Sequence, residues 1–508
     1  MTSPIISRVA RGEYWLKACA LSVLITYMLA LLSSLKAADP DLWGYLAFGR
    51  LFWQSKSFPY RDVFSYIPNL PWVYHEWLTG VMFYPLYQTL GSAGLRILQY
   101  GLALGTSGLV YLTARRRGAY PLSAVLGLLI YIGVFRDWYP PVRAQVFTFF
   151  FFALFLYLLE RARLDRRWQG LYLLPLILIP WCNLHGGFLA GLGLIAIYAF
   201  GEFIGRRPSL PYFLAGLAAA LVTLINPYGV VYWEYLARAV AMPRPYIIEW
   251  ASVIQAYRHD TIPGMLIIFL LMLGVFGSLG MWQSNWREIT ASLALAITLA
   301  LGLRHVRHLH FFFILAGAYL PVCINKNVAY LQSRPWINQW WQRTSVKNGV
   351  SICLGLLTVM NLCLFIIHDP FAWKLPDTSL PPEIKTNMCY PEAAVNLIKK
   401  QGLPGKILTR FDWGEYLIWK LYPQDLVGMD GRYETVYPPE VQQAYFKFYY
   451  GDPQWRQFLR DYPPDLILLD KSMAVVDLIR KEPGWREIFS DSRSVLFAGA
   501  SGHRAAAD

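Results

Sequence analysis

The sequence predicts a polytopic α-helical membrane protein with an α/β soluble domain at its C-terminal end. Of its 508 residues, 56% are hydrophobic and only 15% are charged, and the mean hydropathy is +0.34. With this composition, a soluble multidomain protein of the same length would expose too much apolar surface to water. The apolar residues also fall in runs long enough to span a bilayer, and the basic residues cluster between those runs.

About eleven apolar runs of spanning or near-spanning length predict the membrane helices. They begin near Tyr14, Ala93, Ala119, Ala144, Leu171, Phe188, Leu210, Ile262, Ile289, Leu309 and Val350. The first run is too long for the apolar part of a cleaved signal peptide, so we expect an uncleaved helix there. We expect residues 77–90 to form an interfacial or re-entrant helix, because a twelfth span at that place would reverse every later loop.

The basic clusters set the expected orientation. Those at 115–117, 161–167, 206–207, 287 and 326–347 all fall on the side of the N-terminus. Lys and Arg concentrate in cytoplasmic loops, so this side is expected to be the cytoplasm of a bacterium whose inner membrane the chain spans. The net charge of +14 is therefore explained by basic residues in the loops that set the topology, and we expect no nucleic-acid partner.

This orientation divides the chain into two expected domains. Residues 1–368 form the transmembrane domain, whose long first loop (36–92) is external. Residues 369–508 form a soluble domain in the periplasm or at the outer face. Within it, short apolar strands at 406–409, 426–429 and 466–469 and a helix-like stretch at 391–401 indicate an α/β sheet. It has no Walker or GxGxxG pattern, so we expect no nucleotide cofactor.

Two acidic residues follow the first apolar run directly, in the sequence Asp39-Pro40-Asp41. Acids at the edge of a bilayer usually cap a helix or face a polar cavity, where they bind a cation or accept a proton. The same loop adds three further polar side chains among many aromatic ones: Asp62, His75 and Glu76. Helix capping alone would explain Asp39 but not the others. Asp39 and Asp41 are therefore the candidate catalytic residues.

A set of basic side chains lies on the predicted outer side, where the positive-inside rule disfavours Arg and Lys. The set comprises Arg136, Arg143, His185, Arg304, His305, Arg307 and His308. Arginine presents a planar fork that matches phosphate oxygens, so this set suits a lipid phosphate or diphosphate. The alternative is that single arginines only reach toward anionic lipid headgroups. We expect these residues and the first-loop acids, which form the candidate substrate site, to line one external pocket.

Four segments, taken together, resemble a bacterial family of GT-C-type membrane proteins, many of whose members have no assigned function. The segments are Asp39-Pro40-Asp41-Leu42-Trp43, residues 58–66, residues 71–78 and Asn183-Leu184-His185-Gly186-Gly187. The similarity extends over nearly the whole chain and includes Gly414 and Asp430-Gly431-Arg432.

The resemblance implies a polytopic glycosyltransferase that uses a polyprenyl-phosphate or polyprenyl-diphosphate sugar donor. GT-C enzymes carry an acidic motif in the first external loop, and Asp39 and Asp41 match it, one of them as base or metal-positioning group. Their spacing departs from the adjacent acid pair of better-understood relatives, which leaves open both the choice of base and the need for a divalent cation such as Mg²⁺ or Mn²⁺. The implied partners are the lipid-linked donor, a saccharide, lipid or protein acceptor, and membrane lipids.

Two other classes of protein fit parts of the pattern. A transporter or flippase of lipid-linked saccharide would use the same cationic site, although the sequence shows no clear inverted repeat or Gly/Pro-broken helix pair. A non-catalytic membrane protein of envelope assembly would use the tail domain to recruit a partner, and the first-loop acids would then be dispensable.

Overall fold

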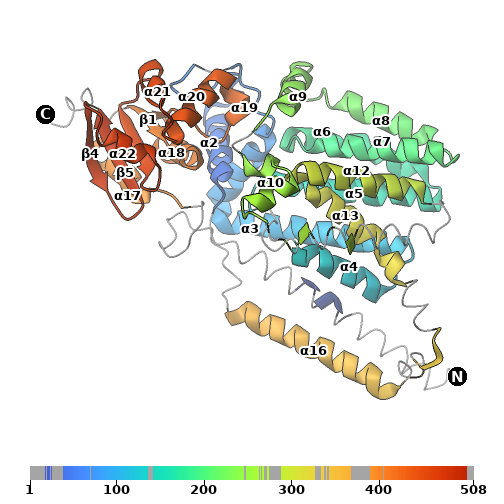
Figure 1. Ribbon diagram of the computed structural model, residues 1–508. Coiled ribbons are helices and arrows are strands. Elements are labelled where there is room, and N and C mark those ends of the chain that lie inside the picture. The colour runs from blue at the N-terminus through green and yellow to red at the C-terminus, as the bar shows by residue number, and fades with distance from the viewer. Residues whose placement is uncertain are drawn as a thin grey trace.

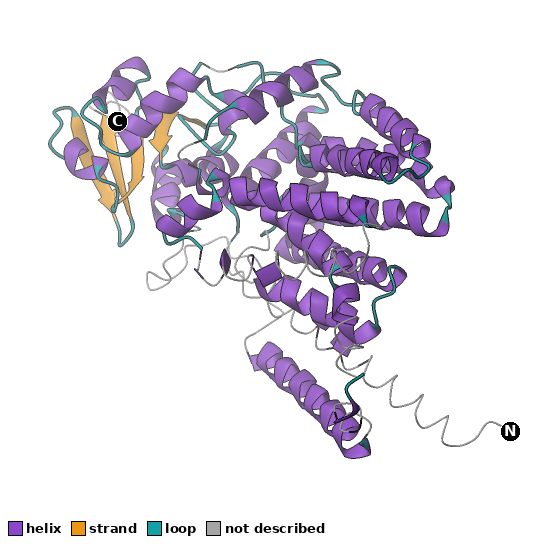
Figure 2. Cartoon of the chain, turned by 45° about the vertical axis from the view of Figure 1, so that its right-hand side comes forward, coloured by secondary structure: helices purple, strands orange, loops and turns teal. Residues whose placement is uncertain are grey.

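The structure, a computed structural model, has a bundle of helices at one end and a mixed α/β domain at the other (Figure 1). It describes residues 38–134, 141–273, 288–325, 343–367 and 389–499, apart from a few single positions, together with short pieces within 18–25 and 333–339. The strands of the described chain all lie in the α/β end (Figure 2).

The bundle consists of apolar helices at the predicted positions. They are α3 (Trp77–Arg116), α4 (Pro121–Val134), α5 (Gln145–Asp165), α6 (Leu173–Leu184), α7 (Phe188–Ile204), α8 (Leu210–Val222), α12 (Ile289–Arg304) and α13 (Leu309–Tyr319). A further apolar helix at a predicted position, α16 (Thr344–Ile367), lies apart from them in Figure 1. Within the described residues, three helical segments are long and apolar enough to cross a membrane: Trp77–Arg116, Gln145–Asp165 and Val306–Asn325. The expected runs near Tyr14 and Ile262 lie largely outside the described residues, so the total of eleven is not confirmed.

The segment 77–90 is helical, as predicted, and a non-helical residue at Gly91 divides it from the next helical segment. It is the first part of α3, which continues to Arg116 across a kink at Gly91. Gly91 has φ 61° and ψ −157°, a conformation that only glycine adopts at low cost. The expected boundary therefore exists as a bend, and the chain remains helical on both sides of it.

The core of the bundle is aromatic and tightly packed. Phe155 packs edge to face against Trp181, with ring centroids 5.0 Å apart, and both side chains are fully buried. α5 contacts α3 and α7, and α7 in turn contacts α8 and α12. A side chain on Gly191 of α7 would collide with the Trp181 ring, so glycine is required at this helix contact.

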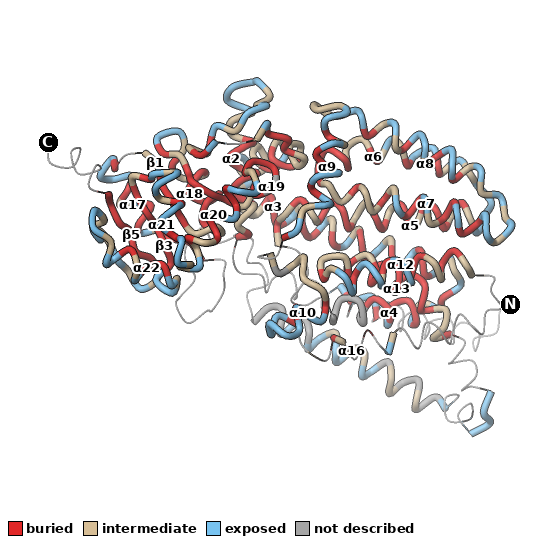
Figure 3. The backbone as a smooth tube through the Cα atoms, turned by 45° about the horizontal axis from the view of Figure 1, so that its top comes forward, coloured by how far each residue is buried: buried red, intermediate tan, exposed pale blue. Residues whose placement is uncertain are grey.

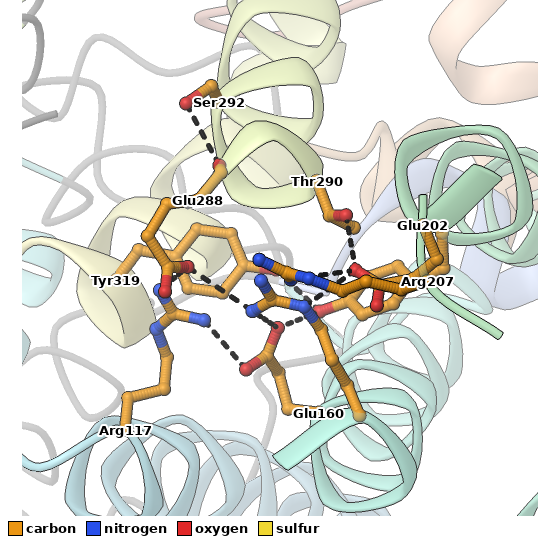
Figure 4. A network of polar contacts seen from close by, with 10 residues as sticks. Arg117, Glu160, Glu202, Arg207, Glu288, Thr290, Ser292 and Tyr319 are labelled. Carbon is orange, nitrogen blue, oxygen red and sulfur yellow. Dashed lines mark hydrogen bonds and ion pairs between the residues drawn. The ribbon is translucent and has the colours of Figure 1, made fainter. Parts of the chain in front are cut away.

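A network of charged side chains joins the helices at the far end of the bundle (Figure 4). We call it the charged brace: Arg117, Glu160, Arg163, Glu202 and Glu288. Arg117 contacts Glu160 and Glu288 at 2.7 Å each, and Arg163 contacts Glu202 at 2.8 Å. The brace lies about 22 Å along α5 from its first residue, at 1.5 Å per residue. Arg207 also pairs with Glu202 of the brace at 3.4 Å, so arginines from three of the predicted cytoplasmic clusters meet at one end of the bundle.

The α/β domain is built on a five-stranded sheet with the order β2-β1-β3-β5-β4. Its strands are β1 (Gly405–Thr409), β2 (Asp425–Val427), β3 (Leu466–Asp470), β4 (Trp485–Ser490) and β5 (Ser494–Gly499). β1 pairs in parallel with β2 and β3, whereas β5 is antiparallel to β3 and β4. The three predicted strands are confirmed as β1, β2 and β3. The antiparallel pair was not predicted.

Helices surround this sheet and complete the domain. They are α17 (Glu392–Gln401), α18 (Gly414–Leu421), α19 (Tyr433–Val436), α20 (Pro439–Tyr449), α21 (Arg456–Asp461) and α22 (Val475–Ile479). All the residues of β3 and β5 are buried. The turns after β1 and β2 lead into α18 and α19, so the carboxyl ends of two parallel strands meet at one edge, as binding loops commonly do.

The first loop packs onto the α/β domain and shares its core. It contains α2 (Pro40–Ser55), which contacts α18. Trp43 of α2 packs against Tyr390 and Tyr416, with ring centroids 5.6 and 5.4 Å apart. Ser65 forms a parallel bridge with Val427, which covers the outer edge of β2. Buried positions consequently continue from the tail through α2 into α3 (Figure 3).

Candidate functional site

The first two acids of the site lie at the start of α2. Asp39 is the N-cap residue, with φ −68° and ψ 144°, and Pro40 follows at the first helical position. The Oδ1 atom of Asp39 accepts a hydrogen bond from the backbone N–H of Asp41 at 3.1 Å. The Asp39 side chain is 4% exposed, whereas that of Asp41 is 28% exposed. The expected cap therefore exists, and it leaves the Asp41 carboxylate accessible.

One guanidinium group holds three carboxylates at this place. Arg143 lies just before α5; its Nε is 3.3 Å from Asp39 Oδ1, its Nη2 contacts Asp41, and its Nη1 is 3.1 Å from Oε1 of Glu249. Glu249 belongs to the short helix η2 (Ile248–Trp250). We call these four residues the Arg143 cluster. It brings together the first loop, the α4–α5 turn and the 226–260 segment.

Burial changes the protonation of the acids in the Arg143 cluster. Burial raises the pKa of Asp39 to about 8, even though Arg143 opposes this change. Burial also raises the pKa of Asp41 against the same opposition. For Glu249, the attraction of Arg143 and Arg307 outweighs burial and lowers the pKa. The cluster therefore retains a proton on the aspartate pair near neutral pH.

A second polar group adjoins this cluster through α2. Tyr45 lies one turn after Asp41 and donates a hydrogen bond to Oε2 of Glu76 at 2.8 Å. Oε1 of Glu76 faces Nε2 of His185 at 3.4 Å and Nε2 of His75 at 3.6 Å. We call Tyr45, His75, Glu76 and His185 the Glu76 group. The sequence predicted three of its four members.

Hydrogen bonding fixes how His185 faces Glu76. The backbone N–H of Gly187 donates to Nδ1 of His185 at 2.9 Å, so the proton of the neutral ring is on Nε2 and faces Glu76. Burial and the positive charges of Arg307 and Arg143 lower the pKa of His185 well below its usual value. Burial raises the pKa of Glu76, against His75 and the Tyr45 hydrogen bond. Burial thus favours the uncharged forms of both Glu76 and His185.

A third, basic group surrounds Trp250. The guanidinium carbons of Arg244 and Arg307 lie over its ring, 4.2 and 4.6 Å from the centroid. His305 donates from Nδ1 to the carbonyl oxygen of Trp250 at 2.7 Å, and the ring of His308 lies 6.0 Å from the indole ring. The electrostatic effect of Arg307 reaches Asp41 in the Arg143 cluster. Trp250 thus holds two guanidinium groups, and that of Arg307 is close enough to act on the acids.

The tail domain also contributes a carboxyl group. Glu415, in the first turn of α18, is 5% exposed, and its Oε2 accepts a hydrogen bond from the backbone N–H of Gly44 at 3.1 Å. Burial raises the pKa of Glu415 well above its usual value, and Asp41 and Asp430 raise it further. The site thus combines side chains from the bundle, the first loop and the tail.

The structure brings most of the predicted site residues together. These are Asp39, Asp41, His75, Glu76, Arg143, His185, His305, Arg307 and His308. Asp62 instead pairs with Arg432 and accepts two backbone N–H groups of its own loop. Arg304 is exposed at the end of α12. Arg136 lies outside the described residues.

Besides Tyr45, four residues of the site were not predicted: Arg244, Glu249, Trp250 and Glu415. The first three lie between α9 (Val231–Ala241) and α10 (Val253–Arg258), and the last lies in the first turn of α18. Arg244, Glu249 and Glu415 could have been found in the sequence as charged residues on the predicted outer side. Trp250 could not be found in this way. Trp250 has no distinguishing signal among 20 tryptophans in the chain.

The arrangement does not fit a divalent cation at the two aspartates. The guanidinium group of Arg143 contacts both Asp39 and Asp41, which is the position that a shared metal ion would take. Over the ranges that the structure describes, no group of three or more His, Cys, Asp or Glu side chains is arranged to hold a metal ion. The positive charge at these acids is therefore supplied by the chain itself.

Comparison with known proteins gives a match in structure but not in sequence. No protein-family model and no curated protein matches the chain. Its structure is similar to the archaeal oligosaccharyltransferase AglB from Archaeoglobus fulgidus in complex with an inhibitory peptide and a dolichol-phosphate. The TM-score is 0.55 at 10% identity, over 90% of this chain and 69% of that one. The same oligosaccharyltransferase tethered with an acceptor peptide gives a TM-score of 0.54 at 11% identity, over 89% and 69% of the chains.

A second enzyme has the same architecture. The arabinofuranosyltransferase AftD from Mycobacteria matches with a TM-score of 0.51 at 12% identity, over 95% of this chain and 40% of that one. The chain has the fold of GT-C membrane glycosyltransferases. The matches to AglB and AftD cover 90% and 95% of this chain, so each of them includes residues of both the bundle and the tail. At these identities the likeness shows the fold alone, and the chemistry of the site depends on this chain's own residues.

Proposed function

We propose that the chain is a GT-C glycosyltransferase that transfers a sugar from a polyprenyl-phosphate or polyprenyl-diphosphate donor to an acceptor at the outer face of the membrane. The observation that supports this best is the Arg143 cluster: two first-loop carboxylates held by one guanidinium at the tail end of a GT-C bundle. The charged brace lies at the other end, about 22 Å away along α5.

Asp41 is the residue we assign as the base. Its side chain is 28% exposed, compared with 4% for Asp39, which is committed to the helix cap. Burial raises the pKa of Asp41 and so strengthens the ionised form as a proton acceptor. Asp39 holds Arg143 in place and retains a proton near neutral pH. The two aspartates thereby take different roles.

The reaction is a displacement at the anomeric carbon of the donor. The acceptor hydroxyl gives its proton to Asp41 while its oxygen forms a bond to the anomeric carbon. The bond from that carbon to the phosphate oxygen breaks, and its electron pair leaves on the phosphate. The sugar passes through an oxocarbenium-like state while negative charge develops on the leaving phosphate oxygen, so positive groups beside that oxygen lower the barrier.

Arg307 and Arg244 are the groups we assign to the departing phosphate. Their guanidinium groups lie over Trp250, beside Glu249 of the Arg143 cluster. Arginine forks match phosphate oxygens, and one well-placed donor of this type is worth about 2.7 to 4 kcal/mol in the transition state. AglB binds a dolichol-phosphate on the same fold, which supports a lipid phosphate as the ligand.

The acceptor is a saccharide, a lipid or a protein, and the tail faces the periplasm or the cell exterior in this proposal. The orientation follows from the basic clusters, three of which meet at the brace end. A periplasm-active reporter fused after Asp508 is expected to be active. Activity of a cytoplasmic reporter at that position would reverse the sidedness.

The activity is tested with Asp39→Asn and Asp41→Asn in a membrane assay with a polyprenyl-phosphate sugar. Asp41→Asn should abolish transfer, because the amide cannot take the proton, and Asp39→Asn should reduce it strongly. Asp461→Asn in the exposed end of α21 is the matched control and should keep full activity. Unchanged transfer by both first-loop variants would refute the catalytic proposal.

A further inference from the structure

Glu415 reaches from the tail domain into the first loop. It lies in the first turn of α18, which packs beside α2 (Figure 1). Its Oε2 accepts the Gly44 N–H at 3.1 Å, and a side chain on Gly44 would collide with the Glu415 carboxyl group. The backbone of α2 therefore accommodates this carboxyl group closely, and only glycine permits the approach.

The other carboxyl oxygen of Glu415 faces Asp41 across Gly431. A Cβ atom placed on Gly431 would be 3.0 Å from Glu415 Oε1 and 3.2 Å from Asp41 Oδ1. The two oxygens are therefore no more than about 6 Å apart. Hydrogen bonds from a hydroxyl group to oxygen are about 2.7 Å long, so a substrate hydroxyl that binds one of these oxygens lies close to the other.

The charges around Glu415 favour its neutral form. Burial raises its pKa well above the usual value, and the negative charges of Asp41, Asp430 and Asp39 add to this effect. Arg432 opposes it, but this guanidinium is already bonded to Asp430 at 2.7 Å. Arg143 is likewise bound to the three acids of its own cluster.

We propose that Glu415 is a neutral carboxylic acid that the tail domain places beside Asp41, where it donates a hydrogen bond to a hydroxyl group of the saccharide substrate. This inference rests on the proposed function and deepens it. The tail domain then completes the site and holds the hydroxyl that reaches Asp41. Glu415 binds the substrate, and Asp41 takes the proton.

The substitutions Glu415→Gln and Glu415→Ala separate this role from others. Gln keeps a neutral hydrogen-bond donor of the same length, so it should retain kcat/KM within about threefold of the wild type. Ala removes the donor and should lower kcat/KM at least about tenfold. Glu440→Gln, at an exposed position in the first turn of α20, is the matched control and should leave transfer unchanged. Full activity of the Ala variant would overturn the proposal, as would loss of transfer in a folded Gln variant.

A second measurement does not depend on activity. A carboxyl group with a raised pKa in the folded protein contributes its stability at low pH and loses it as pH rises toward the folded pKa. The melting temperature of the wild type in detergent should therefore fall relative to that of Glu415→Gln between pH 5 and pH 8. A constant difference between the two over that range would refute the neutral carboxyl group. If the wild type transfers no sugar from any donor, the proposed function fails, and the melting result still decides the protonation of Glu415.

Discussion

Replacing Arg143 tests whether its positive charge keeps the aspartates of the site ionised. In Arg143→Gln, three carboxylates lose their common cation. At 3.3 Å and an effective dielectric constant of 20, the attraction between Arg143 and Asp39 alone is about 5 kcal/mol. Its loss should raise the pKa of the aspartate pair further, so a smaller fraction of Asp41 is ionised at neutral pH.

The expected result is a loss of sugar transfer by a factor of about 10² to 10³, the usual effect of removing one electrostatic group. Because the ionised aspartate is the active form, the acid limb of the plot of kcat/KM against pH should move to higher pH. Raising the pH should therefore restore part of the activity. Arg143→Lys should be intermediate, since one ammonium group cannot contact all three carboxylates.

The assay is sugar transfer from a polyprenyl-phosphate donor in membranes between pH 5 and pH 9. Arg258→Gln, in the exposed last turn of α10 (Val253–Arg258), is the matched control, because it removes one positive charge on the same side of the bundle. An Arg143→Gln variant with normal activity and an unmoved acid limb would show that the guanidinium does not control the aspartates.

Three further outcomes follow from other contacts. Glu160→Gln should destabilise the protein by about 3–5 kcal/mol, because Arg117 is left buried without this partner; a lower melting temperature in detergent is the measurement. Trp43→Ala should cost about 3–5 kcal/mol at the loop–tail contact, and limited proteolysis should then cleave the tail faster, unlike in an exposed Trp53→Ala control. Dialysis against EDTA should leave most of the transfer activity, because Arg143 already supplies the positive charge at the acids; a complete loss restored by Mg²⁺ or Mn²⁺ would contradict this reasoning.

The helices of the bundle and the parallel strands were predictable because their signals are local. Apolar runs and short apolar strands are read within a window of about ten to twenty residues. The cap at Asp39 was likewise predictable, since Pro40 follows it directly. The end of the segment 77–90 was also predictable, because the backbone leaves the helical conformation at Gly91.

The partners of the site residues were not predictable, because they are remote in sequence. The sequence analysis expected Arg143 and Asp41 to line one pocket, but it could not show that the two side chains, 102 residues apart, pair directly. Asp62 looked like a site acid, whereas its partner Arg432 is 370 residues further along the chain. Glu415 was passed over because one acid in an ordinary helix start carries no signal until its neighbours are known.

The shared core of the first loop and the tail has a consequence for biosynthesis. Trp43 and Asp62 emerge from the ribosome about 370 residues before the segments that bury them. At about 5–20 residues per second, that gap lasts roughly 20 to 75 seconds. Throughout this interval the aromatic-rich first loop lacks the tail residues that bury it, so the maturing chain requires protection by a chaperone or by the membrane surface until those residues are made.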